Sequence, residues 1–428
     1  MQRKFTSFRS GDNDKFKRGL LNFGEKFSNF CFLENNNYDF EKSVDCIAGI
    51  GSLQAIRSDE NSGLEALVSF QKNHPDWIFG HAGYDLKNKI ENLSSANFDG
   101  IGMPDYFFFV PDIVVIIAGD NISIGTNGTE NPEEIFSRIN ASSCGDNTHQ
   151  KPSLKSRISR QEYLDIVAGL QQHIARGDCY EVCFCQEFYA QPAQIDPVKA
   201  FLALNRLSPN PFAAFYKWED RYLLCASPER FLKKTGTEVI SQPIKGTLRR
   251  SAGGTESDAR EAEKLFADAK ERAENIMIVD LVRNDLSKVC QPGTVTVRDF
   301  LKIHSFPGVH QMISTIRGEV PKDITFGELL AATFPMGSMT GAPKIKAMEL
   351  IEKYEKTRRG LFSGTLGYID PEGNFDFNVV IRSLLYNRKT HYLSAQVGSA
   401  ITINSVAEKE YEECKSKIAA IIKLLNEQ

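Results

Sequence analysis

Long apolar runs are missing from this sequence, and their absence excludes a membrane-spanning protein. The longest apolar stretch, from Phe107 to Ala118, is interrupted by Pro111 and Asp112. It is too short to cross a bilayer and predicts a buried strand instead. The first residues, Met1 to Ser7, form no apolar signal segment. We therefore expect a cytoplasmic protein that needs no membrane.

An excess of one charge is also missing. The 51 Lys and Arg residues nearly balance the 55 Asp and Glu residues, so the formal net charge is −4. No long run of basic residues occurs, which argues against a nucleic-acid partner. A chain of 428 residues is long enough to bury a large core in one or two domains.

Paired cysteine motifs are lacking as well. The nine cysteines are scattered, and their only cluster is Cys179, Cys183 and Cys185. This spacing lacks the paired CxxC of a zinc site. Buried, reduced thiols are the expected state.

Turn-rich residues from Asn140 to Ser156 mark the expected linker. They divide the chain into a strand-rich region, residues 1–145, and a second region, residues 155–428. In the second region, patterning predicts a strand over Cys179–Tyr189, a helix with one break over Asp258–Leu286, and a strand over Asp376–Tyr386. Strands and helices alternate irregularly, which favours an α+β fold of antiparallel sheets flanked by helices.

Lys245 lies in the short motif Pro243-Ile244-Lys245-Gly246-Thr247. The proline fixes one backbone angle and the glycine leaves space beside the amine. With Glu229 shortly upstream, Lys245 could be a nucleophile paired with a proton donor. A solvated lysine in a turn explains the same residues.

Glutamates on two helices suggest a metal site. Glu274 shares a helical face with Ile278 and Leu281, so its carboxylate must be paired, protonated or metal-bound if that face is buried. On the last helix, Glu410, Glu413 and Lys417 share one face. Two glutamates from distant helices would suit Mg²⁺, which prefers a few carboxylate oxygens. A surface charge at Glu274 and an exposed ion-pair ladder on the last helix remain alternatives.

Three further segments could hold an anion. Residues 334–344, Phe-Pro-Met-Gly-Ser-Met-Thr-Gly-Ala-Pro-Lys, place Thr340 and Gly341 before a helix start, but without the ending of a phosphate-binding Walker A loop. Arg382 would share one side of its strand with Asn378 and could hold a carboxylate, although a structural salt bridge is equally compatible. Gly398-Ser399-Ala400 could present backbone amides.

Five motifs, in order, give the second region a resemblance to the chorismate-utilising enzymes, and within them to the aminodeoxychorismate synthases. They are ASPER at 226–230, PIKGT at 243–247, RAENIMIVDLVRNDL at 272–286, FPMGSMTGAPK at 334–344 and EYEECKSK at 410–417. The first region matches more loosely, through FGHAGYDL at 79–86 and PDYFF at 104–108. The resemblance implies an α+β fold in which antiparallel sheets pack as a sandwich flanked by helices.

The resemblance also implies roles for matched residues. Glu274 and Glu413 would hold Mg²⁺ at the ring carboxylate of chorismate. Glu229 would protonate the departing C4 hydroxyl while Lys245, with its pKa lowered by burial, attacks C2. Arg382 and the backbone amides of Gly398, Ser399 and Ala400 would contact the substrate. The other expected substrate contacts are Gly246, Thr247, Thr340, Gly341, Phe362 and Lys417.

Position 245 discriminates within the family. Anthranilate synthases resemble this chain but usually carry alanine there, and isochorismate synthases usually carry a lysine where this chain has Glu181. The departures are Glu181 where glutamine is usual, Gln311 where histidine is usual, and Phe362 where tyrosine or tryptophan is common.

The implied activity is the Mg²⁺-dependent amination of chorismate at C4 to 4-amino-4-deoxychorismate, for 4-aminobenzoate and folate synthesis. No Gly-x-Cys-x-Gly turn of a glutamine-hydrolysing domain occurs, so ammonia would come from a separate glutamine amidotransferase subunit. The alternatives are an anthranilate synthase component I and a non-catalytic chorismate-binding subunit.

Overall fold

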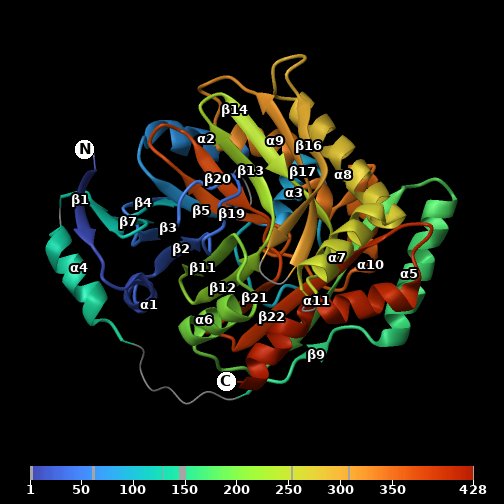
Figure 1. The fold of residues 1–428 in the computed structure, drawn as a ribbon, viewed down its shortest axis with the longest axis horizontal. Helices are drawn as coiled ribbons and strands as arrows, with labels where there is room; N and C mark the ends of the chain where they lie inside the picture. The colour runs from blue at the N-terminus through green and yellow to red at the C-terminus, as the bar shows by residue number, and fades with distance from the viewer. Residues whose placement is uncertain are drawn as a thin grey trace.

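Two antiparallel β-sheets pack face to face, with helices outside them (Figure 1). The computed structural model describes residues 3–59, 63–128, 130–143, 151–251, 254–306 and 309–427. The larger sheet runs in the order β1 (Lys4–Arg9), β8 (Asn121–Thr126), β7 (Ile113–Ala118), β3 (Cys46–Ile50), β2 (Asn29–Glu34), β11 (Phe212–Trp218), β12 (Arg221–Ser227), β21 (Ser383–Asn387), β22 (Tyr392–Ile401), β10 (Glu181–Ala190), β18 (Gly341–Ala342), and β9 (Lys155–Ser156) also pairs with β10.

The smaller sheet carries the PIKGT motif at one edge. Its order is β15 (Ile244–Arg249), β17 (Val309–Glu319), β14 (Glu238–Gln242), β13 (Arg230–Thr235), β20 (Phe375–Asn378), β19 (Thr365–Ile369), β5 (Ile78–Ala82), β6 (Tyr106–Val110), β4 (Gln54–Arg57), and β16 (Thr296–Phe306) pairs with β17. The predicted α+β sandwich of antiparallel sheets is confirmed.

The helices cover the outer faces of the sheets. Those packed against the larger sheet include α1 (Asn13–Gly24), α4 (Pro132–Ala141), α5 (Arg160–Ala175), α6 (Pro197–Leu207), α10 (Lys344–Tyr354) and α11 (Ala407–Glu427). Those packed against the smaller sheet include α2 (Leu64–Asn73), α7 (Thr255–Ala267), α8 (Ala269–Ser287) and α9 (Phe326–Thr333), and α3 (Lys87–Ile90) is a single turn. Asp268 separates α7 from α8 and caps α8, so the predicted single break is confirmed.

Strand β10 shows how the sequence builds the two cores. Val182 and Phe184 enter the cluster under α5 and α11, whereas Cys183 and Cys185 enter the cluster between the sheets. Successive strand residues point to opposite faces, so the alternation predicted over Cys179–Tyr189 is confirmed. Glu181 is on the inner side with Cys183.

The strand predicted over Asp376–Tyr386 is wrong. The chain leaves the smaller sheet after β20, at Asn378, and enters the larger sheet as β21, at Ser383. Arg382 has a φ of +51° in between, a left-handed conformation that breaks a strand. Asn378 and Arg382 therefore do not share one side of a continuous strand.

The first region contributes strands to both sheets: β1–β3, β7 and β8 extend the larger one, and β4–β6 the smaller one. The division at residues 145–155 stays a prediction from the sequence. Across the described ranges, no helix is long and apolar enough to span a bilayer. Eight cysteines in those ranges are buried and free of disulfides, as predicted, and Cys144 lies outside them.

Candidate active site

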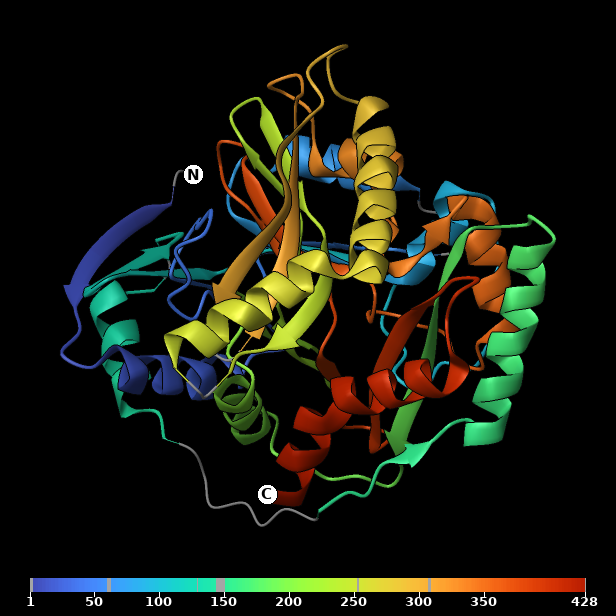
Figure 2. The same ribbon diagram turned by 45° about the vertical axis from the view of Figure 1, so that its right-hand side comes forward.

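The predicted site residues gather where the start of α8 meets the start of α11, beside β10 and β15. Figure 2 shows α7 and α8 (yellow) above α11 (red), with the green β10 behind them. Lys270 Nζ lies 2.8 Å from Glu410 Oε1 and joins the two helices. The motifs at 272–286 and 410–417 therefore meet, although more than 120 residues separate them in the sequence.

A β-bulge turns Lys245 into this site. The pairing of β15 with β17 shifts between Ile244, opposite Ile313, and Thr247, opposite Gln311. Two residues of β15, Lys245 and Gly246, thus face one residue of β17, and Gly246 has a φ of +85°. Such bulges re-aim side chains. A Cβ at Gly246 would lie 3.2 Å from the Glu271 carboxylate, so the glycine also lets α8 pack closely.

Lys245 lies between two buried carboxylates. Its Nζ is 3.3 Å from Glu181 Oε1 and 3.6 Å from Glu274 Oε2. Burial acts to lower the pKa of Lys245, but the charges of Glu181 and Glu274 outweigh burial and raise it well above its ordinary value. The predicted lowering of the Lys245 pKa is therefore wrong, because the sequence did not show that Glu181 faces the lysine.

Acidic groups outnumber basic ones around this lysine. We call the following residues the charged cluster: Glu181, Lys245, Lys270, Glu271, Glu274, Glu410, Glu413 and Lys417. Burial and the neighbouring Glu274 and Glu413 raise the pKa of Glu271 to about 7. One oxygen each of Glu181, Glu274 and Glu410 is buried without a hydrogen-bond partner among the described residues. Buried carboxylate oxygens without donors favour a bound cation or proton.

Glu229 approaches the cluster from the loop between β12 and β13. Its backbone amide donates to Ser227 Oγ, and its carbonyl accepts the amide of Val379. Burial raises the pKa of its carboxyl to about 7, against the lowering effects of Ser338 and Lys245. A carboxyl with such a pKa keeps a large protonated fraction near neutral pH, as a general acid requires.

Basic side chains occupy the other end of the site. Lys417 Nζ donates to the Gly398 carbonyl at 2.7 Å and pairs with Glu413 at 2.6 Å. Arg382 Nη1 donates to the Lys417 carbonyl at 3.5 Å, and burial lowers the pKa of its guanidinium. Lys417, Gly398 and Arg382 are thus brought together, as the sequence predicted. Lys417 and Glu413 belong to the charged cluster, so their ion pair links Gly398 and Arg382 to it.

The remaining predicted contacts lie around these groups. Thr340 is fully buried and its hydroxyl donates to the Met336 and Gly337 carbonyls. Gly341 lies against the Glu181 backbone, where an added Cβ would come 2.1 Å from the carbonyl oxygen. Ser399 Oγ bonds the Tyr163 hydroxyl, and Ala400 pairs with Cys183.

Phe362 and Thr247 differ in burial. Phe362 packs in the same hydrophobic cluster as Met339, whereas Thr247 is exposed on β15. His310, next to Gln311, donates from Nε2 to the Asp258 carboxylate, and its Nδ1 bonds the Ser305 hydroxyl. It therefore belongs to the contact of β17 with α7 and β16.

Sequence reasoning missed the structural support of the site. Arg359 is fully buried, pairs with Glu355 at 2.6 Å, and donates to the carbonyls of Cys183 and Met339. It therefore ties β10 to the loop that carries Ser338 and Thr340. An Arg at i+4 from a Glu was the only available signal, and that spacing is ordinary for an exposed helix pair.

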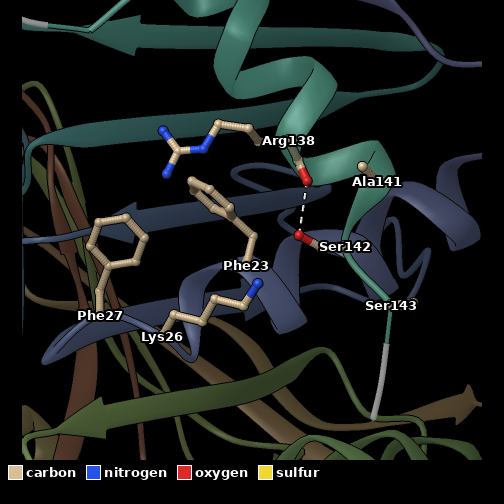
Figure 3. Close-up of a pocket in the computed structure, with 7 residues that line it drawn as sticks. All are labelled: Phe23, Lys26, Phe27, Arg138, Ala141, Ser142 and Ser143. Atoms are coloured by element: carbon tan, nitrogen blue, oxygen red, sulfur yellow. Dashed lines mark hydrogen bonds between the residues drawn. The ribbon is translucent and has the colours of Figure 1, made fainter.

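A separate hollow of about 490 Å³ lies between α1 and α4, away from the predicted site (Figure 3). Phe23 and Phe27 form its apolar wall, and Arg138 extends over the Phe23 ring. None of the predicted site residues lines it.

The chain belongs to the chorismate binding enzyme family, whose model matches residues 28–423. It is therefore an enzyme of the chorismate-binding class. It is 36% identical over 348 residues to aminodeoxychorismate synthase component 1 of Escherichia coli K12, covering 81% of this chain and 76% of that protein. It is 32% identical to anthranilate synthase component 1 of Thermus thermophilus, covering 88% of this chain and 85% of that protein.

Solved structures show the same fold. Anthranilate synthase component I from Streptococcus pneumoniae aligns with a TM-score of 0.76 at 23% identity and covers 92% of each chain. The menaquinone-specific isochorismate synthase MenF from Escherichia coli aligns with a TM-score of 0.79 at 16% identity and covers 99% of this chain and 94% of its own.

Proposed function

We propose that this protein aminates chorismate at C4 to give 4-amino-4-deoxychorismate. The observation that carries the proposal is the bulge that presents Lys245 beside a protonatable Glu229. Relatives named aminodeoxychorismate synthase component 1, at 34–36% identity, support it. The product would lead to 4-aminobenzoate and folate.

Each residue has a chemical task in the proposed reaction. Lys245, as the free amine, forms a bond to C2 while the ring double bonds shift and the C4–O bond breaks. Glu229 gives its proton to the departing hydroxyl, which leaves as water. Ammonia then bonds to C4, the C2–Nζ bond breaks, and its electron pair returns to Lys245. The proton from the new C4 ammonium restores Glu229, so the cycle closes.

The proposal includes Mg²⁺ held by Glu274 and Glu413. The donor set fits: both carboxylates belong to the charged cluster, and Glu274 Oε1 is buried without a hydrogen-bond partner among the described residues, with Lys270 Nζ 3.6 Å away. Mg²⁺ accepts a few carboxylates together with waters and substrate oxygens. Among the described residues, no three acidic, His or Cys side chains form a ready-made metal site. Bound there, Mg²⁺ would supply positive charge for the ring carboxylate and offset the excess of glutamates.

Arg382, Lys417 and the amides of Gly398–Ala400 would meet the second carboxylate of chorismate. A planar guanidinium that donates to one carbonyl keeps further donors for a carboxylate. The name "component 1" of the relatives points to a second component, which we propose is a glutamine amidotransferase that supplies ammonia. We also propose that the enzyme works in the cytoplasm.

The reaction is tested with purified protein, chorismate, MgCl₂ and an ammonium salt, with products separated and identified by mass. Aminodeoxychorismate supports the proposal. Anthranilate with pyruvate would overturn it in favour of the activity named for the Thermus relative. Unchanged chorismate, with binding shown by calorimetry, would indicate a non-catalytic chorismate-binding subunit.

A further inference from the structure

We propose that Cys183 and Cys185 form a redox-sensitive modification site, at which a hydroperoxide oxidises the two thiols to a disulfide and stops the enzyme. Both cysteines belong to β10, and both are free thiols in this structure. Neither has a task in the proposed amination, so the inference goes beyond that function. Disulfides that form transiently in a reducing compartment are usually catalytic or redox-sensing.

The two thiols lie side by side on one face of β10. Side chains two residues apart in a strand point to the same side, and both cysteines enter the hydrophobic cluster between the sheets. Their sulfur atoms are within hydrogen-bonding reach of each other. Both side chains are largely buried, so an oxidant as small as hydrogen peroxide suits this position.

Backbone contacts connect the thiol pair to the candidate active site. The Cys183 amide donates to the Thr340 carbonyl at 2.8 Å, and the Cys183 carbonyl accepts from Arg359 at 2.7 Å. Cys185 pairs with Gly398 of β22. Its Sγ occupies the space that a side chain at Gly398 would need, because an added Cβ would lie 2.4 Å from the sulfur. A movement of the pair would therefore reach the proposed substrate contacts at Thr340 and Gly398.

The surroundings give the two thiols different roles. The hydrogen bond with Cys185 lowers the pKa of Cys183 against the effect of burial. The positive charges of Arg359, Lys245 and Lys417 lower it further. Burial instead raises the pKa of Cys185. The thiolate is the form that reacts with oxidants, so Cys183 is the attacking sulfur and Cys185 the protonated thiol that resolves the first product.

The oxidation proceeds in two steps. The Cys183 thiolate attacks one oxygen of the hydroperoxide, so that an S–O bond forms, the O–O bond breaks, and the departing oxygen takes up a proton as water or an alcohol. Cys183 is then a sulfenic acid. The Cys185 sulfur attacks it, the S–S bond forms, and the S–O bond breaks as hydroxide leaves with the Cys185 proton as water. The sulfur pair loses two electrons, which the hydroperoxide gains, and a dithiol reductant returns them.

The strand makes this disulfide both inhibitory and reversible. At a rise of about 3.2–3.4 Å per residue, Cα atoms two residues apart in a strand are separated by about 6.4–6.8 Å. A disulfide accepts Cα separations of about 4.4–6.8 Å, so the bond must bend β10 around Phe184. The bend should displace the contacts at Thr340 and Gly398 and thereby stop catalysis. Strain also makes a disulfide easier to reduce, as a reversible switch requires.

The test treats the reduced full-length chain with hydrogen peroxide, removes the excess with catalase, and measures consumption of chorismate. Free thiols are then alkylated, and the tryptic peptide of residues 177–199, which contains Cys179, Cys183 and Cys185, is analysed by mass spectrometry. We expect the reduced peptide to carry an alkyl group on each cysteine and the oxidised peptide to carry one, with a disulfide between the other two. The rate should be lost with the disulfide and recovered with dithiothreitol. An unmodified peptide, a full rate despite the disulfide, or a loss that dithiothreitol does not reverse would overturn the proposal.

Three variants locate the modified thiols, each compared with its own reduced sample. Cys183→Ser should keep its rate through the peroxide treatment. Cys185→Ser should stop at the sulfenic acid, which dimedone traps as an adduct on Cys183. The control is Cys179→Ser, which alters the same peptide but a side chain in the other cluster, under α5 and α11, and it should respond as the wild type does. Inactivation of Cys183→Ser as fast as the wild type, or protection by Cys179→Ser, would refute the site.

The disulfide is measured independently of the proposed amination. If no aminodeoxychorismate forms, but the disulfide appears and abolishes chorismate binding in calorimetry, the amination is wrong and the redox site stands. If aminodeoxychorismate forms, but peroxide neither links the two thiols nor lowers the rate, the amination stands and the redox site is wrong.

Discussion

Replacement of Lys245 by alanine should destabilise the protein as well as inactivate it. Glu181 is fully buried and, among the described residues, its only ion pair is with Lys245, whereas Glu274 also contacts Lys270. Removing one partner of a buried ion pair costs about 3–5 kcal/mol, because the other charge is left uncompensated. That is a large fraction of the roughly 5–15 kcal/mol that stabilises a typical domain.

Protonation of Glu181 limits this cost. Burial raises the pKa of Glu181, while Lys245 acts to lower it, so removal of the lysine raises the pKa further. A carboxyl whose folded pKa exceeds its unfolded value of about 4.3 destabilises the fold above the folded pKa. The penalty in Lys245→Ala is therefore complete at alkaline pH and disappears as the pH falls toward the unfolded value.

The double variant Lys245→Ala/Glu181→Gln provides the critical comparison. Removal of both charges should recover most of the lost stability, since the glutamine carries no charge. Urea unfolding, followed by circular dichroism at an alkaline pH and at a pH near the unfolded carboxyl value of about 4.3, measures the difference. The reasoning is refuted if Lys245→Ala is as stable as the wild type at the higher pH, or if the double variant is no more stable than Lys245→Ala. Amination should be lost in both variants, which separates chemistry from folding.

Four further predictions test the site. Glu229→Gln should lower kcat by about 10²–10⁴ with little change in the KM for chorismate, as measured by steady-state kinetics. EDTA should abolish activity and MgCl₂ restore it, and Glu274→Gln should raise the half-saturating Mg²⁺ concentration at least about tenfold, since losses of about 10–100-fold follow when metal-site groups are altered. Gly341→Ala should lower the Tm and the activity together, because its φ of +142° and the 2.1 Å approach to the Glu181 carbonyl leave no room for a Cβ. The neighbouring Cys185 thiol lowers the pKa of Cys183 to about 7 despite burial, so iodoacetamide should inactivate the enzyme, and chorismate or Cys183→Ser should protect it.

The sequence pattern correctly predicted the features of the fold that depend mainly on residues close together in the chain, such as the two faces of β10 and the break between α7 and α8. The two-residue period of β10 identified its two faces because successive side chains point to opposite sides of the sheet. Val182 and Phe184 pack in the cluster under α5 and α11, whereas Cys183 and Cys185 pack between the sheets. The break between α7 and α8 was predictable because Asp268 favours a helix N-cap over a helix interior. Motif order then predicted which distant residues meet, and the structure brings Lys245 and Glu274 within 3.6 Å.

The electrostatic state of Lys245 was not predictable in this way. It depends on the β15 bulge, which is defined only by pairing with β17, and on Glu181 from the other sheet. The strand predicted through Arg382 failed for a similar reason. Its apolar neighbours satisfy a strand pattern, but the crossing from one sheet to the other places Arg382 at a φ of +51°. Both outcomes are set by contacts between segments far apart in the sequence.

The arrangement of charges explains why one departure at position 181 has consequences for the whole site. Arg382 and Lys417 form an end suited to a carboxylate, and Glu274, Glu410 and Glu413 form an end suited to a cation. A glutamine at position 181 would leave Lys245 facing Glu274 alone. Glu181 adds a second carboxylate beside Lys245 and raises the pKa of the lysine, which would slow its proposed attack on C2 unless cations enter with the substrate. A site of this composition should therefore work only when positive charge is bound beside its carboxylates, and the response of the rate to Mg²⁺ is the measurement that tests this dependence.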